Sequence, residues 1–111
     1  MVKLSKAYCC EHLPCFPDTR SIVTATWNRC FGRRRWATLT EVVKACNRFA
    51  RGRAEMWAYD LLREVLGEEL FASDLLSAYR REPRIRGSWC AVDLRWARKI
   101  DAEWEGTLDY C

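Results

Sequence analysis

The segment that most constrains the fold is residues 38–50, TLTEVVKACNRFA. Its apolar residues recur at the spacing of one helix face; they are Leu39, Val42, Val43, Cys46, Phe49 and Ala50. Thr38 and Glu41 stand three residues apart at its start, which is the pattern of a capping box. Gly52 follows and favours a helix end. The sequence therefore predicts an amphipathic helix whose apolar face packs on the rest of the chain.

Three further segments favour helices. Residues 54–67 and 68–82 have helical apolar spacing and end at Gly67 and Pro83. Residues 87–106 fit a helix capped by Ser88, with a shared apolar face that comprises Trp89, Val92, Trp96, Ile100 and Trp104. The alternation over residues 90–97 also allows a strand, but the helix propensity of the later residues favours a helix.

Strand signals are confined to the N-terminal part. Residues 21–27, SIVTATW, are rich in β-branched residues and predict a strand, with a turn at Gly32. Pro14 and Pro17 interrupt any helix in the preceding segment, which we leave unassigned. We predict a single α+β, helix-dominated domain in which a small N-terminal strand or hairpin packs on three to four helices. Residues 1–36 form its irregular and β part, 37–105 its helical part and 106–111 a tail.

Charge is unevenly distributed along the chain. Residues 1–53 contain eleven Lys or Arg and three acidic residues, whereas residues 54–111 contain eight Lys or Arg and twelve acidic residues. The first part thus carries a net charge of +8 and the second −4, which gives the overall +4. Fifteen of the nineteen basic residues are arginine, whose planar guanidinium suits phosphates and carboxylates. This segregation indicates a molecule with one basic end.

Eight basic residues fall within residues 29–53, where Glu41 is the sole acid. We call them the basic strip: Arg29, Arg33, Arg34, Arg35, Lys44, Arg48, Arg51 and Arg53. Lys44, Arg48 and Arg51 share the helix face opposite the apolar one. Trp36 follows the arginine triplet and could act as an aromatic anchor by stacking on a base or on an arginine of a partner. An alternative is that acids of the second half, Glu55, Glu68, Glu69, Asp101, Glu103, Glu105 or Asp109, neutralise the strip internally.

The seven cysteines suggest a possible metal site. Cys9, His12 and Cys15 lie close together around the single histidine, and Cys30 could supply a fourth ligand to Zn²⁺. The spacing matches no regular zinc finger, and the alternative is that these thiols are simply buried. An odd number of cysteines and the absence of an apolar leader favour reduced thiols in a cytoplasmic setting.

No motif for catalysis is apparent, since the lone histidine has no partner on a separate rigid element. No run approaches the roughly 18 apolar residues of a membrane span, so we expect no membrane partner. The sequence predicts a small non-enzymatic binding protein that contacts nucleic acid or a nucleoprotein complex through the basic strip. The alternatives are an inhibitor or adaptor that occludes an acidic or basic protein surface, for example a phage-type anti-defence protein, and an accessory subunit of a large assembly.

Overall fold

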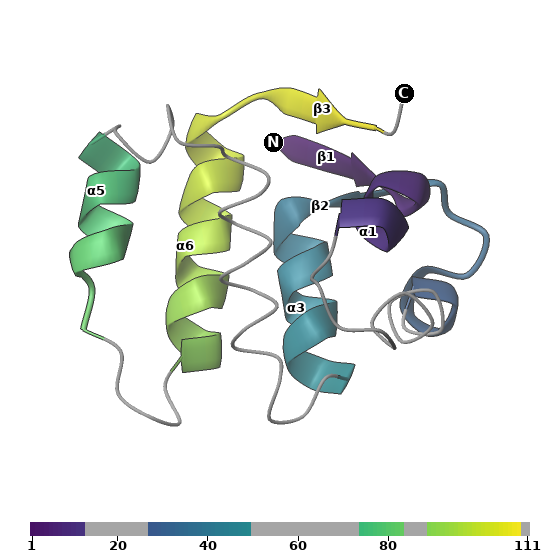
Figure 1. Cartoon of the computed structure of the whole chain (residues 1–111), viewed down its shortest axis with the longest axis horizontal. Coiled ribbons are helices and arrows are strands. Elements are labelled where there is room, and N and C mark those ends of the chain that lie inside the picture. Colours follow the sequence, from purple (N-terminus) through teal and green to yellow (C-terminus); the bar gives the residue numbers. More distant parts are fainter. Residues whose placement is uncertain (13–26, 50–73, 84–88, 110–111) are drawn as a thin grey trace.

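The computed structural model describes residues 1–12, 27–49, 74–83 and 89–109. The described helices and strands form a helix-dominated α+β domain, as the sequence predicts (Figure 1). In chain order they are β1 (Val2–Ser5), α1 (Lys6–His12), β2 (Trp36–Thr38), α3 (Leu39–Phe49), α5 (Asp74–Arg81), α6 (Trp89–Glu103) and β3 (Gly106–Leu108). The predicted helix at 54–67 and the start of the one at 68–82 lie outside these residues.

The strands form one small sheet in the order β2-β1-β3. β1 pairs antiparallel with β2 and parallel with β3. The sheet lies across one end of the helices, because β2 leads directly into α3 and α6 is followed by β3 (Figure 1). Val2 and Leu4 are buried while Lys3 between them is exposed, so one face of β1 meets the core and the other is open to solvent.

Helix α3 begins with the predicted capping box. The backbone N–H of Glu41 donates to Thr38 Oγ1 at 3.1 Å, and the backbone N–H of Thr38 donates to Glu41 Oε1 at 3.1 Å. Leu39, Val42 and Val43 are buried in the core. The amphipathic helix predicted from residues 38–50 is confirmed through Phe49.

The segment 87–106 is a helix, not a strand, over Trp89–Glu103. Val92, Trp96 and Ile100 are buried along one face, and Trp104 packs partly buried against the same core. This face packs on α3, and the contact between the two helices forms the core. No helix in the described part of the chain is long and apolar enough to cross a membrane.

The carboxylate of Asp101 joins three elements near the end of α6. Its Oδ1 accepts a hydrogen bond from the backbone N–H of Val2 at 2.9 Å, and its Oδ2 accepts from the backbone N–H of Thr40 at 2.8 Å. The Thr40 hydroxyl donates to the same oxygen. The hydrogen bonds with Thr40 place the negative charge of Asp101 at the first turn of α3, where the helix dipole favours it. Asp101 therefore fixes β1 and the start of α3 against α6.

Helix α5 is held against α6 by a buried polar contact. The Tyr79 hydroxyl donates to Asp93 Oδ1 at 2.6 Å, and both side chains are fully buried. The Tyr79 ring also meets Trp96 edge to face, with ring centroids 5.7 Å apart. Burial of a carboxylate is costly without a hydrogen-bond donor, so the bond from Tyr79 offsets part of the cost of burying Asp93.

The strand prediction for residues 21–27 is wrong at its end. Trp27 begins a short helical turn at residues 27–31. Its indole is buried and meets the Phe31 ring edge to face, with the ring centroids 4.8 Å apart. Residues four apart come into contact in a helix and not in a strand. The packing of Trp27 on Phe31 therefore outweighs the strand propensity of Trp27. Residues 21–26 lie outside the described part.

None of the three strands was predicted from the sequence. β1 lies in the unassigned N-terminal segment, β2 crosses the boundary at residue 37 where we expected the helical part to begin, and β3 occupies residues 106–108, where we expected a tail. Thr107 of β3 lies beside Lys3, so the two ends of the chain share the sheet. Strands of three or four residues carry too short an alternation to be recognised, and their pairing depends on contacts far apart in sequence.

Candidate functional site

The three adjacent arginines lie in a turn between the helical residues 27–31 and β2. Gly32 adopts φ +58°, a left-handed conformation that favours glycine at a helix end, and its N–H donates to the carbonyl of Asn28 at 3.0 Å. The Trp27 indole N–H then donates to the carbonyl of Arg34 at 3.0 Å. The turn is thereby fixed to the core, while Arg33, Arg34 and Arg35 are all exposed.

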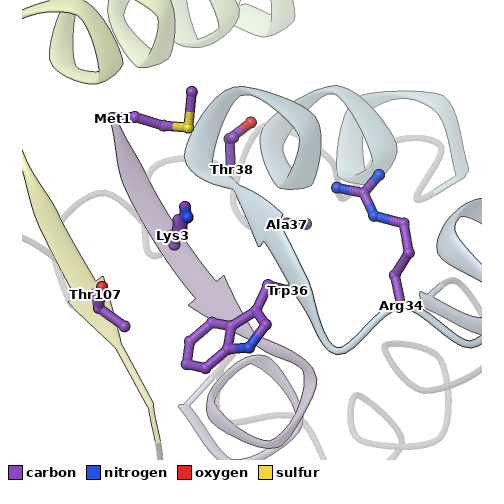
Figure 2. Close-up of a pocket in the computed structure, with 7 residues that line it drawn as sticks. All are labelled: Met1, Lys3, Arg34, Trp36, Ala37, Thr38 and Thr107. Carbon is purple, nitrogen blue, oxygen red and sulfur yellow. The ribbon is translucent and has the colours of Figure 1, made fainter.

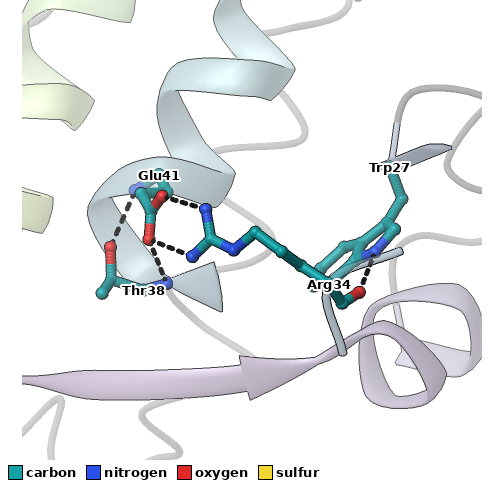
Figure 3. A network of polar contacts seen from close by, with 4 residues as sticks. All are labelled: Trp27, Arg34, Thr38 and Glu41. Atoms are coloured by element: carbon teal, nitrogen blue, oxygen red, sulfur yellow. Dashed lines mark hydrogen bonds and ion pairs between the residues drawn. The ribbon is translucent and has the colours of Figure 1, made fainter. Parts of the chain in front are cut away.

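Arg34 forms a two-pronged ion pair with Glu41 of α3 (Figure 3). The two nitrogen–oxygen distances are 2.7 and 3.0 Å, and the guanidinium also lies 5.3 Å from the centre of the Phe31 ring. The hydrogen bond from Arg34, helped by those from Thr38, lowers the pKa of Glu41 to about 2. Glu41 thus completes the helix cap and pairs with an arginine of the basic strip.

Arg35 is partly neutralised from the other end of the chain. Its guanidinium lies 3.5 Å from Asp109 and 5.6 Å from the centre of the Trp36 ring. Asp109 is one of the acids that the sequence offered as an internal partner for the basic strip. Internal neutralisation therefore occurs at Arg35, through an exposed ion pair of the kind that contributes little stability.

A hollow of about 540 Å³ lies between the helical residues 27–31 and α3. We call it the basic groove; its lining residues are Arg29, Cys30, Phe31, Glu41, Lys44, Ala45 and Arg48. Lys44 and Arg48 stand one turn apart on α3, and Arg29 comes from the opposite wall. Glu41 is the one acid among these described lining residues, and its carboxylate is already bonded to Arg34. The groove is therefore electropositive.

A second hollow, of about 450 Å³, lies on the open face of the sheet (Figure 2). We call it the sheet hollow; its lining residues are Met1, Lys3, Arg34, Trp36, Ala37, Thr38 and Thr107. Lys3 on the central strand stands directly between Thr38 of β2 and Thr107 of β3. No acidic residue is among the lining residues that the structure describes. Arg34 lines this hollow and Glu41 lines the basic groove, so their ion pair stands between the two.

Of the four proposed zinc ligands, only Cys9 and Cys30 have side chains that the structure describes. Cys9 is buried in the hydrophobic core, and Cys30 is half-buried in the wall of the basic groove. Burial raises the pKa of the Cys30 thiol despite the nearby charges of Arg48 and Arg29, so it is protonated at neutral pH. The side chain of His12 and the whole of Cys15 lie outside the described residues. Among those described, no cluster of three or more His, Cys, Asp or Glu could hold a metal.

The structure thus divides the basic strip. Arg29, Lys44 and Arg48 meet in the basic groove, Arg34 and Trp36 line the sheet hollow, and Arg51 and Arg53 lie outside the described residues. Arg33 projects from the turn, with no ion pair to any residue of the described ranges. Sequence reasoning missed Lys3 and Thr107, because their place on the sheet depends on two strands that it did not predict.

Comparison of the chain with protein-family models, curated proteins and solved structures found no match.

Proposed function

We propose that this protein binds nucleic acid through the basic groove and carries out no catalysis there. The observation that supports the proposal best is the convergence of Arg29, Lys44 and Arg48 on one hollow. The one acid in its described lining, Glu41, is held by Arg34. Such a groove attracts a polyanion without an opposing carboxylate free to repel it.

The chemistry of these side chains suits a phosphate backbone. Arginine presents a planar fork of donors to phosphate oxygens, and lysine adds a compact positive charge. Lys44 and Arg48 follow one another along α3, so they can contact successive phosphates of one strand. Contacts of this kind position a nucleic acid without reading its sequence. We therefore expect binding that is tolerant of sequence and strongly dependent on salt.

Charge reversal in the groove tests the proposal. The double variant Lys44→Glu/Arg48→Glu should weaken binding to a mixed-sequence fragment at low salt by at least about tenfold, since it loses two contacts and adds two repulsive charges. The matched control is the double variant Arg81→Glu/Arg98→Glu, which reverses two exposed charges on α5 and α6 that line neither hollow. Circular dichroism should show that all variants keep their helices.

Equal losses for the groove variant and for Arg81→Glu/Arg98→Glu would overturn the proposal, because binding would then follow net charge alone. If wild-type protein does not bind nucleic acid at low salt, the proposal also fails. An acidic protein surface would then become the partner to seek, as the inhibitor or adaptor alternative requires.

A further inference from the structure

The sheet hollow differs in character from the basic groove, because it combines an aromatic ring with positive charge. The indole of Trp36 is partly exposed and lies along the hollow (Figure 2). The Arg35 guanidinium lies 5.6 Å from its ring centre, and Lys3 lies on the neighbouring strand. Trp36 lies on the edge strand β2 and is only partly buried, whereas Trp27 and Trp96 are buried in the core.

The strand register places these groups at useful positions. Lys3 pairs with Thr38, which is two residues beyond Trp36 on β2, so Lys3 and Trp36 share the open face as diagonal neighbours. Diagonal neighbours across antiparallel strands lie about 7–8 Å apart. An amine and a flat ring at this separation can contact a phosphate and a base of the same strand of nucleic acid. Thr107 extends the same face on the far side of Lys3.

We propose that the sheet hollow is a stacking site for an unpaired base of single-stranded nucleic acid. The base lies on the indole of Trp36, and the adjoining phosphates meet Lys3 and also Arg35, which exchanges its exposed ion pair with Asp109 for a phosphate. The inference rests on the proposed function: the basic groove supplies general attraction for phosphates, and the sheet hollow favours strands whose bases are free. The basic groove and the sheet hollow lie on either side of the Arg34–Glu41 ion pair. One strand of nucleic acid can therefore reach from the groove to the hollow.

Base stacking on an aromatic ring requires an exposed base. In a duplex the base faces are already covered by their neighbours, so Trp36 would meet only the backbone. Single-stranded nucleic acid combines a polyanionic backbone with flat faces, and proteins that bind it without sequence preference use cationic grooves together with aromatic platforms. An acidic peptide would satisfy Lys3 and the arginines but gives the indole no specific role.

Three ligands of one length test the site with the full chain. They are a mixed-sequence single strand of about ten nucleotides, its duplex, and an abasic single strand that keeps the phosphates but lacks the bases. The wild-type protein should bind the ordinary single strand more tightly than the abasic one. This comparison needs no variant, so it remains decisive if a substitution at Trp36 impairs folding.

The substitutions Trp36→Ala and Trp36→Phe then locate the contact. Trp36→Ala should weaken binding of the ordinary strand by about 5- to 150-fold, the usual range for the loss of one stacked base. It should leave binding of the duplex and the abasic strand unchanged, and Trp36→Phe should retain most of the affinity. Lys3→Gln should weaken both single strands, whereas the control Lys99→Gln, on α6, should not.

Equal affinity of wild-type protein for ordinary and abasic strands would overturn the stacking site, as would equal losses of all three ligands in Trp36→Ala. Either result is compatible with salt-dependent binding in the basic groove, so the proposed function would survive it. Failure of all three ligands to bind at low salt would overturn both proposals together.

Discussion

Replacement of Glu41 by Gln should have opposite effects on stability and on binding. Glu41 has two roles, as the reciprocal member of the capping box with Thr38 and as the partner of Arg34. Gln keeps the size of the side chain and an oxygen that can accept from the Thr38 N–H, since Glu and Gln both serve in capping boxes. Glu41→Gln therefore removes the ion pair and preserves the cap.

The loss of stability can be estimated from the pKa of Glu41. Taken at face value, its fall from 4.5 to about 2 corresponds to about 3 kcal/mol. The side chains of Arg34 and Glu41 are 51% and 36% exposed, so water and salt screen much of this interaction. Part of the shift also comes from the hydrogen bonds with Thr38, which Gln can retain. We therefore expect Glu41→Gln to lower the free energy of unfolding by about 1 kcal/mol.

The contribution of Glu41 to the free energy of unfolding depends on pH. Because the pKa of Glu41 is lower in the folded protein, its charge stabilises the fold above pH 4.5, and this contribution is lost as pH falls towards 2. Urea unfolding of the wild type and of Glu41→Gln should differ by about 1 kcal/mol at neutral pH, and by progressively less in acid. A difference that does not change with pH would refute the ion pair as its source.

The same substitution should strengthen nucleic-acid binding. It removes the one acid from the described lining of the basic groove and releases Arg34 for a phosphate. One additional phosphate contact should steepen the slope of log K against log salt by about 0.7 to 0.9. Glu82→Gln is the matched control, because it also removes one acid from an ion pair, with Arg95, and lines neither hollow. A similar gain of affinity in both variants would show that the effect follows net charge rather than the release of Arg34.

Three further predictions concern stability. Tyr79→Phe should lower the free energy of unfolding by about 1–3 kcal/mol, because the buried Asp93 loses a donor; Phe conserves the ring, so urea unfolding should report the hydrogen bond alone. Asp101→Ala should cost at least about 2 kcal/mol, since it leaves the N–H groups of Val2 and Thr40 without their acceptor, and an unchanged urea midpoint would contradict this role. If zinc is bound by the N-terminal cysteines, a chelator should lower the thermal midpoint of purified protein and mass spectrometry should detect the metal; protein that is free of metal and indifferent to chelator would dismiss the zinc prediction.

The parts of the fold that depend on local pattern could be predicted from the sequence. The capping box and the apolar face of α3 are read within a dozen residues, and the buried face of α6 is carried by Val92, Trp96 and Ile100 at helical spacing. Each of these elements contains its own start signal or periodicity. Local chemistry was therefore sufficient to identify them.

The sheet could not be predicted in the same way. β1 depends on pairing with β2, more than 30 residues later, and with β3 near the end of the chain. None of the three strands is long enough to show a clear alternation. The sequence also located the basic strip without revealing that the turn at Gly32 sends Arg34 back to Glu41. The division into two hollows follows from that turn.

The most direct test of the central claim is the affinity of wild-type protein for a mixed-sequence single strand, measured over a range of salt concentrations. Three cations line the basic groove, namely Arg29, Lys44 and Arg48. If all three neutralise phosphates, the groove alone should give log K a slope of about −2 against log salt, and contacts at Lys3 and Arg35 would make the slope steeper. Tight binding with no dependence on salt, or no binding at low salt, would contradict the assignment of the basic groove to nucleic acid.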